Sequence, residues 1–134
     1  MLGEKIGEIS GKVTMQRVLP SLGGDPKMET SFQASGSVLT TNIKDTGTYW
    51  TVVRPDGTQY GEGRGVMMTR DGKVATWTGH DVGTVKEDGT ATYRGALYFQ
   101  TMPQRWSRLN KVAVLFEYAV DAEGNTHSEY WEWK

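Results

Sequence analysis

Four turn signals divide much of this chain into segments of similar length. Asp-Gly pairs stand in "RPDGT" (54–58), "RDGK" (70–73) and "KEDGT" (86–90), about 16 residues apart, and "DAEGN" (121–125) adds a fourth signal. Glycine after aspartate readily adopts the positive φ that two-residue hairpin loops need, and "EGN" suits a slightly longer loop. The spacing therefore predicts one hairpin after another.

The segments between the turns have the composition of β-strands. Glycine (17 residues), threonine and valine are abundant, and helix-forming runs are nearly absent. We predict eight strands, at 6–19, 27–40, 46–54, 58–69, 73–85, 90–101, 111–121 and 126–133. Strands much longer than the usual length of about 5 to 6 residues tend to curl and close when they follow one another antiparallel. The predicted fold is all-β, a single antiparallel, mostly up-and-down eight-stranded barrel that forms one domain over residues 1–134.

Composition excludes several classes of function. The 134 residues carry 15 Lys plus Arg against 16 Asp plus Glu, without a long run of either sign, which argues against nucleic acid as a partner. The chain has no cysteine, so disulfides and thiolate chemistry are excluded. The N-terminal "MLGEKIGEIS" lacks the apolar segment of a signal peptide, and no stretch approaches 18 apolar residues. We expect a cytoplasmic protein without a membrane partner.

The predicted strand 58–69 has an unusual division between its two faces. Side chains alternate along a strand, so one face carries Tyr60, Glu62, Arg64, Val66 and Met68, and the other carries Gly61, Gly63, Gly65 and Met67. If the glycines face inward, they make room for large residues such as Trp77, and Glu62 and Arg64 form a surface pair. If the other face points inward, Glu62 and Arg64 lie in the cavity and bind a polar group of a ligand, with Arg17 and Arg94 able to join them. Both alternatives stay open.

Other candidate residues lie on neighbouring segments. Glu117 interrupts an apolar strand and requires either a partner arginine or a raised pKa. No catalytic set is assigned, and the candidates are Glu62, Arg64 and Glu117. The candidate ligand-binding residues are Tyr60, Glu62, Arg64, Trp77, Arg94, Tyr98 and Trp106.

The two histidines, His80 and His127, lie on different strands and lack the spacing of metal ligands, so no metal is expected. His80 and its neighbour Asp81 point to opposite faces of their strand, and His80 is interpreted as a surface residue. No cofactor-binding motif is present in the sequence, and no cofactor is expected.

Three further segments carry predictions about packing. Pro103 breaks the strand pattern, and the turn at 103–109 would place Trp106 and Leu109 over one barrel end, as a plug or as a mobile lid. The segment 111–120 is apolar on both faces, which indicates a neighbouring subunit or a covering segment outside the wall. Trp131 and Trp133 share a face with His127 and Glu129, and this face either closes the core or forms an interface.

The stretch "GTYWTVVRPDGTQYGEGRGVMMTRDGKVATWTGHDVG", followed by "YRGALYFQT", resembles the allene oxide cyclase-like barrels and their small bacterial relatives. The similarity covers the pattern of residues 46–101 and consists of glycine and aromatic spacings. It implies a calycin-like eight-stranded barrel with a hydrophobic cavity, frequent self-association and, in the plant enzymes, a cofactor-free cyclisation. No residue matches that enzyme's catalytic set, so the resemblance supports the fold more than the reaction.

Two hypotheses on function follow. In the first, the barrel binds an apolar small molecule in its interior and is a candidate for cofactor-free cyclisation or isomerisation. In the second, it is a non-enzymatic structural or interaction protein, a homo-oligomer that self-associates through 111–120 and 126–133.

Overall fold

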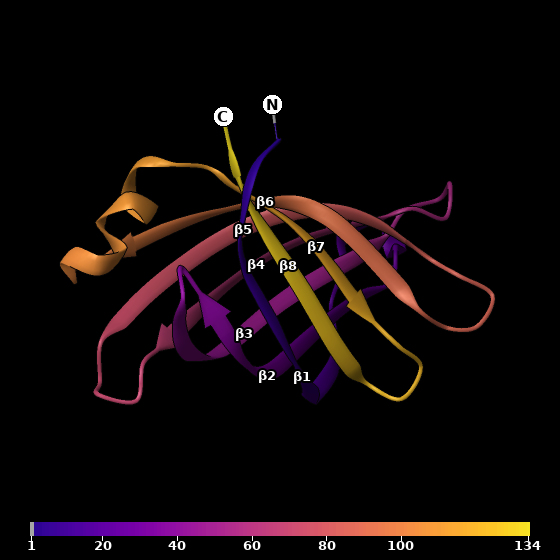
Figure 1. Ribbon diagram of the computed structural model, residues 1–134. Coiled ribbons are helices and arrows are strands. Elements are labelled where there is room, and N and C mark those ends of the chain that lie inside the picture. Colours follow the sequence, from indigo (N-terminus) through magenta and orange to yellow (C-terminus); the bar gives the residue numbers. More distant parts are fainter. Residues whose placement is uncertain (1) are drawn as a thin grey trace.

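The computed structural model describes residues 2–134 and contains eight antiparallel strands that pair in sequence order and close into a barrel, with β8 against β1 (Figure 1). The strands are β1 (Leu2–Leu19), β2 (Lys27–Val38), β3 (Thr41–Val53), β4 (Gln59–Met68), β5 (Val74–Val85), β6 (Ala91–Thr101), β7 (Val114–Val120) and β8 (Asn125–Trp133). Leu2 pairs with Trp133, so the two ends of the chain lie side by side. The predicted all-β, eight-stranded barrel is confirmed.

Four of the hairpin turns share one geometry, which differs from the two-residue loops expected from the Asp-Gly pairs. Each is a three-residue loop that ends in a glycine with φ between 84° and 87°, at Gly57, Gly72, Gly89 and Gly124. In the first of them, Arg54 N donates to Thr58 O at 2.8 Å and Gly57 N donates to Arg54 O at 2.9 Å. A type I turn followed by a left-handed glycine explains why aspartate precedes the glycine, because Asp56 Oδ1 also accepts from Thr58 N.

A fifth hairpin, between β2 and β3, has no glycine at all. Its two turn residues, Leu39 and Thr40, have φ of 48° and 63°. Both residues therefore adopt the left-handed conformation that a type I′ turn requires and that a β-branched residue rarely takes. The strand predicted to begin at residue 46 consequently begins at Thr41.

The glycines of β4 face the barrel interior, which settles the question left open by the sequence. A Cβ built on Gly65 would lie 2.3 Å from Trp77 Cε2, and one on Gly61 would lie 2.6 Å from Asp81 Oδ1. The alternative in which glycine makes room for Trp77 is therefore confirmed. Because the faces alternate, Glu62 and Arg64 lie on the outside of the wall.

The interior is packed with aromatic and aliphatic side chains from every strand. Phe32 lies between Tyr49, Trp77 and Tyr118, with ring centroids 5.8 to 6.3 Å apart. Aromatic pairs at such separations add about 0.5 to 1.5 kcal/mol each to the effect of buried area. This cluster fills the middle of the barrel.

The segment after β6 forms a 3₁₀ helix, η2 (Gln104–Lys111), in place of the single turn expected at 103–109. Trp106 and Leu109 are fully buried on its inner side, as the sequence predicts. Arg108 joins η2 to the barrel, because its guanidinium pairs with Glu132 and, at 2.8 Å, with Glu4 Oε1. The buried Trp106 fits the interpretation of this segment as a plug.

The outer faces of β7 and β8 are only half covered. Leu115 and Trp131 pair across the two strands and are half-buried, whereas Trp133 is 58% exposed. The tryptophans of β8 therefore do not close the core, a role that Tyr130 on the opposite face takes. Within residues 2–134 no helix is both long and apolar enough to span a membrane.

Candidate functional site

Two inward glycines face each other where β4 meets β5. Gly63 and Gly79 are register partners in these two strands, so at this point neither strand has a side chain. The backbones of both glycines border a cavity inside the barrel and also a groove outside it. Tyr49 borders both spaces as well. The candidate site therefore has an inner side and an outer side, separated by one layer of backbone.

The interior cavity has a volume of about 40 Å³. Its walls are mainly aromatic, and the lining residues are Phe32, Tyr49, Gly63, Trp77, Gly79, Asp81, Leu97, Phe116, Tyr118, Ser128 and Tyr130. Ligand pockets usually measure about 300 to 1,000 Å³. The interior therefore has room for a few atoms of the size of water and not for a drug-sized molecule.

Among the described residues, Asp81 is the one carboxylate that borders the interior cavity. Its Oδ1 atom is fully buried and has no hydrogen-bond partner within residues 2–134. Burial raises the pKa of Asp81 to about 6, and the nearby His80 only partly opposes this effect. Asp81 as a residue is half-buried, but a charged oxygen buried without a partner is unfavourable, so Asp81 is a functional candidate on physical grounds.

Tyrosine hydroxyls supply further polar groups near the cavity. Tyr49 and Tyr118 share a hydrogen bond of 3.1 Å, and Tyr93 donates to Gln59 Oε1 at 2.6 Å. Burial raises the pKa of all three tyrosines, so they are neutral donors and acceptors at physiological pH. These hydroxyls cannot neutralise a charge on Asp81.

On the outer side, a groove of about 360 Å³ crosses β2 to β5 over the paired glycines, and we call it the outer groove. Its lining residues are Glu29, Thr48, Tyr49, Trp50, Glu62, Gly63, Arg64, Thr78, Gly79 and His80. Two of the predicted site residues, Glu62 and Arg64, lie in its wall. Its volume falls within the range of ligand pockets.

A chain of hydrogen bonds connects three side chains at this groove. The Tyr60 hydroxyl donates to Glu62 Oε2 at 2.9 Å and lies 2.8 Å from His80 Nδ1. Because the hydroxyl has one proton, His80 Nδ1 must then be the donor to the Tyr60 oxygen. In a neutral imidazole this leaves Nε2 as the accepting nitrogen. The arrangement therefore determines which nitrogen of a neutral His80 ring can accept a proton.

The same groove has an aromatic side formed by Trp50. The Trp50 and Tyr60 rings are 5.8 Å apart, and the Tyr60 and His80 rings are 6.3 Å apart. Lys27 Nζ lies 4.4 Å from the centroid of the Trp50 ring, a favourable cation–π contact. Arg17 pairs with the groove residue Glu29 at 2.9 Å.

The remaining predicted site residues do not gather at one place. Trp77 lines the interior cavity, Trp106 lies buried on the inner side of η2, and Tyr98 is exposed on the outside of β6. Arg94 pairs with Glu117 at 3.3 Å on the outer surface. Glu117 therefore has the arginine partner expected as one alternative from the sequence, but it is exposed and is not a buried charge that requires one.

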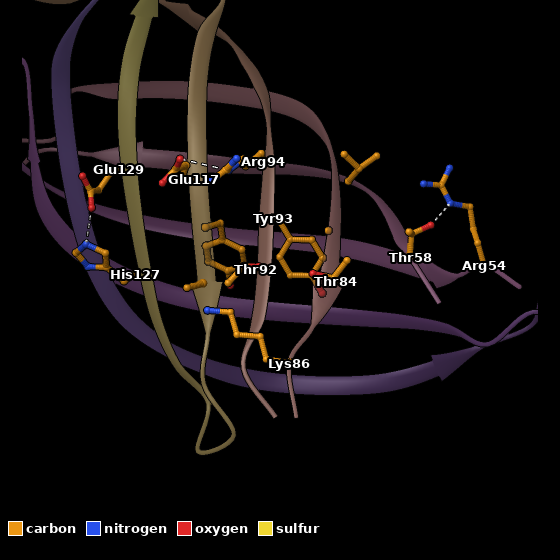
Figure 2. Close-up of a pocket in the computed structure, with 14 residues that line it drawn as sticks. Arg54, Thr58, Thr84, Lys86, Thr92, Tyr93, Arg94, Glu117, His127 and Glu129 are labelled. Carbon is orange, nitrogen blue, oxygen red and sulfur yellow. Dashed lines mark hydrogen bonds and ion pairs between the residues drawn. The ribbon is translucent and has the colours of Figure 1, made fainter. Parts of the chain in front are cut away.

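A larger, shallow groove of about 690 Å³ lies near the hairpin ends of β5 to β8, and Figure 2 shows its side chains. It is lined by Arg54, Thr58, Val82, Gly83, Thr84, Lys86, Thr92, Tyr93, Arg94, Glu117, Tyr118, Ala119, His127 and Glu129. Several of its charged groups are already paired with one another, including Arg94 with Glu117. It therefore offers fewer polar groups to a ligand than its size indicates.

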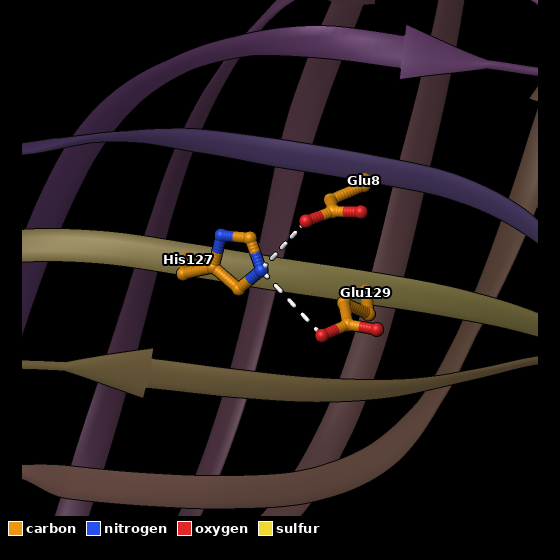
Figure 3. Close-up of side chains that lie close together, drawn as sticks. All are labelled: Glu8, His127 and Glu129. Atoms are coloured by element: carbon orange, nitrogen blue, oxygen red, sulfur yellow. Dashed lines mark ion pairs between the residues drawn. The ribbon is translucent and has the colours of Figure 1, made fainter.

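Barrel closure also brings together Glu8, His127 and Glu129, which are drawn in Figure 3. His127 Nε2 lies 3.1 Å from Glu8 Oε2 and 3.5 Å from Glu129 Oε1, and Lys5 Nζ binds the other oxygen of each carboxylate. Sequence reasoning missed this cluster because Glu8 and Glu129 meet only through the pairing of β1 with β8. All its members are at least partly exposed, and the Lys5 ammonium and the His127 ring already contact the two acids.

The fold and the groove define a closed β-barrel with a candidate small-molecule site on its wall. No family model and no curated protein matches the chain. Three solved structures resemble it, each with a TM-score of 0.83: a protein of unknown function from Clostridium acetobutylicum (15% identity, covering 98% of both chains), a conserved protein of unknown function from Rhodopseudomonas palustris (12%, covering 98% of this chain and 97% of that one) and a beta-barrel like protein from Acinetobacter baumannii (11%, covering 100% and 96%). At these identities the likeness is one of fold.

Proposed function

We propose that this protein binds a small organic molecule with an apolar or planar body in the outer groove. The main observation in its support is a space of about 360 Å³ outside the wall. Trp50 gives this space an aromatic side, the backbones of Gly63 and Gly79 form its floor, and the hydrogen-bonded Glu62, Tyr60 and His80 lie at its rim. The lining is mixed, with Trp50 as an apolar surface and Glu62, Arg64 and His80 as polar groups that can fix the orientation of a ligand. This proposal keeps the predicted residues Tyr60, Glu62 and Arg64.

The position of the ligand differs from the interior position expected from the sequence. The cavity of about 40 Å³ is several times smaller than the lower end of the range for ligand pockets. The outer groove reaches that range without any movement of the barrel. We therefore place the ligand outside the wall.

Each groove residue has a distinct role in this proposal. Trp50 contacts the flat or apolar part of the ligand, and Arg64 attracts an anionic or carbonyl oxygen. His80 accepts or donates a proton through Nε2, while Glu62 acts through Tyr60 as a positioning residue. If a reaction accompanies binding, proton transfer within a bound molecule, as in an isomerisation, is the class that suits one oriented imidazole. We also propose that the barrel is related to the allene oxide cyclase-like barrels, as its glycine and aromatic spacings suggest.

The test is a panel of small aromatic and aliphatic carbonyl compounds, titrated while tryptophan fluorescence and thermal stability are recorded. We expect one chemical class to bind, with affinity reduced at least tenfold in Trp50→Leu and in His80→Ala. The matched controls are Trp133→Leu and His127→Ala, which alter the same residue types on β8. Binding that is unaffected by the groove variants, or equally weakened by the controls, would refute the outer groove as the site.

A second candidate function is self-association through β7 and β8. Its specific observation is the adjacent outward side chains of Leu115, Trp131 and Trp133, of which Trp133 is 58% exposed. Large exposed apolar side chains that lie together often mark an interface. We expect an oligomer by light scattering that dissociates in Trp131→Glu and stays intact in Met102→Glu, a change at an exposed loop residue. A monomeric wild-type protein would contradict this second candidate.

A further inference from the structure

The interior cavity has two features that both attract a cation. One is the buried Asp81 Oδ1, which has no hydrogen-bond partner within residues 2–134. The other is a wall of six aromatic rings, from Phe32, Tyr49, Trp77, Phe116, Tyr118 and Tyr130. Aromatic faces carry partial negative charge and attract cations. Both features therefore favour a positive charge in the same small space.

The chain itself does not supply that charge at the cavity. No lysine, arginine or histidine is among the residues that line it. The titratable groups that influence Asp81 from neighbouring elements are His80 on its own strand, Tyr49 on β3, Tyr60 on β4 and Tyr93 on β6. His80 points to the outer surface, where it contacts Tyr60. The tyrosines are neutral and can only donate or accept hydrogen bonds.

We propose that the interior cavity binds a small ammonium cation, either ammonium itself or methylammonium, between Asp81 and the aromatic rings. The cation would form a charge-assisted hydrogen bond to Asp81 Oδ1 and cation–π contacts with the rings. The tyrosine hydroxyls of Tyr49 and Tyr118 border the same space and can accept its remaining N–H groups. This site is independent of the outer groove.

Size restricts the ligand more strongly than charge. A volume of about 40 Å³ is enough for a cation of one or two heavy atoms, given that one water needs roughly 10 to 15 Å³ on the same measure. Tetramethylammonium has five heavy atoms and is too large. Sodium and potassium can share the carboxylate but donate no hydrogen bonds to the hydroxyls. The proposal therefore predicts a preference for ammonium over the alkali metals.

The experiment uses ammonium chloride and methylammonium chloride against sodium chloride at equal ionic strength, at pH 8, where Asp81 is ionised. We expect the melting temperature to rise by about 5 °C when the ammonium ion is at ten times its Kd. NMR of protein labelled with nitrogen-15 at its tryptophans provides a local signal, because Trp77 lines the cavity. Its indole N–H resonance can be assigned with the variant Trp77→Phe. That resonance should shift with ammonium and stay unchanged with tetramethylammonium.

Three variants separate binding from general effects of salt. Asp81→Asn removes the charge with little change of shape, and the ammonium response should fall at least tenfold in affinity. Ser128→Val fills the cavity with apolar atoms and should abolish the response while the barrel stays folded. Asp56→Asn, at an exposed turn, should leave the response intact, and lowering the pH to 4.5 should remove it in the wild type.

Three outcomes would refute the proposal. One is an equal response to ammonium, potassium and sodium, which would indicate a general salt effect. Another is a specific response that persists in Asp81→Asn or at pH 4.5, because the cation would then lie elsewhere. A folded wild-type protein whose Trp77 indole resonance does not respond to ammonium would also refute it.

Discussion

Replacing Asp81 with asparagine should stabilise this barrel at neutral pH and have little effect in acid. Burial raises the pKa of Asp81 from 3.8 to about 6 in the folded protein. A carboxyl group whose pKa is higher in the folded protein than in the unfolded chain binds its proton more tightly in the folded state. Its folding penalty is therefore absent below pH 3.8, grows as the pH rises from about 4 to 6, and is constant above that window.

The size of the effect follows from the pKa difference. A shift of about 2 pKa units corresponds to about 3 kcal/mol, at 1.36 kcal/mol per unit. Because asparagine has the shape of the protonated acid and no charge, Asp81→Asn removes this penalty. The difference in unfolding free energy between variant and wild type should therefore widen by up to about 3 kcal/mol between pH 4 and pH 7.5. Asp45 also has a pKa raised to about 6 by burial, but it is present in both proteins and cancels.

The assay is urea denaturation followed by far-ultraviolet circular dichroism, at pH 4, 5, 6 and 7.5 in sodium buffers free of ammonium. Asp56→Asn serves as the control with the opposite sign, since hydrogen bonds from Thr58 hold the pKa of Asp56 below its usual value. That variant should lose stability relative to wild type as the pH rises. Parallel stability curves for wild type and Asp81→Asn, with no widening across pH 4 to 6, would refute the conclusion that Asp81 is buried without a partner.

Three further variants test the packing of the wall at Gly65, the conformation of the turn at Thr40 and the attachment of η2 to the barrel by Arg108. Gly65→Ala should lower the unfolding free energy by about 3 kcal/mol, because the new Cβ would lie 2.3 Å from the Trp77 ring; a urea midpoint equal to that of wild type would contradict the inward orientation of β4. Thr40→Gly should raise it by about 1 kcal/mol, since glycine removes the cost of a β-branched residue at a φ of 63°, and a loss of stability would show that the turn is not strained. Arg108→Met should lower the melting temperature more at pH 7 than at pH 4, because Arg108 holds the pKa of Glu132 below its usual value and that stabilisation disappears as Glu132 is protonated. Arg105→Met, which removes only the exposed contact to Asp71, is the matched control and should have almost no effect.

The strand pattern could be predicted from the sequence because barrel walls obey simple rules. Asp-Gly pairs recur at the ends of alternating segments, and all three of them do close hairpins. The turn at Leu39 and Thr40 could not be located from the sequence because neither residue is of a type usually found in tight turns. Tertiary pairing of β2 with β3 imposes that conformation against local preference, and no local signal identifies it.

The candidate site was only partly predictable, and the reason is the direction in which side chains point. Tyr60, Glu62 and Arg64 stand out in the sequence as an unusual group, but their position inside or outside the wall depends on a shift of one residue. Asp81 was considered only as a neighbour of His80. A usable signal existed, because Asp81 is four residues from Trp77 and must share its face in a strand. Once Trp77 is placed in the core, Asp81 is placed there too.

The glycines of β4 and the charges beside them are one feature and not two. Each inward glycine leaves space for a particular large or polar group, Trp77 at Gly65 and Asp81 at Gly61, and Gly83 of β5 does the same for Tyr93. From Gly61 onward, and apart from the buried Met67, the inward face of β4 is glycine and contributes little apolar contact of its own, so its other face is free to be polar where it meets water. The same absence of side chains at Gly63 and Gly79 leaves only backbone between the outer groove and the interior cavity. It follows that a substitution at either glycine should disturb both spaces at once, whereas one at His80 should disturb only the groove.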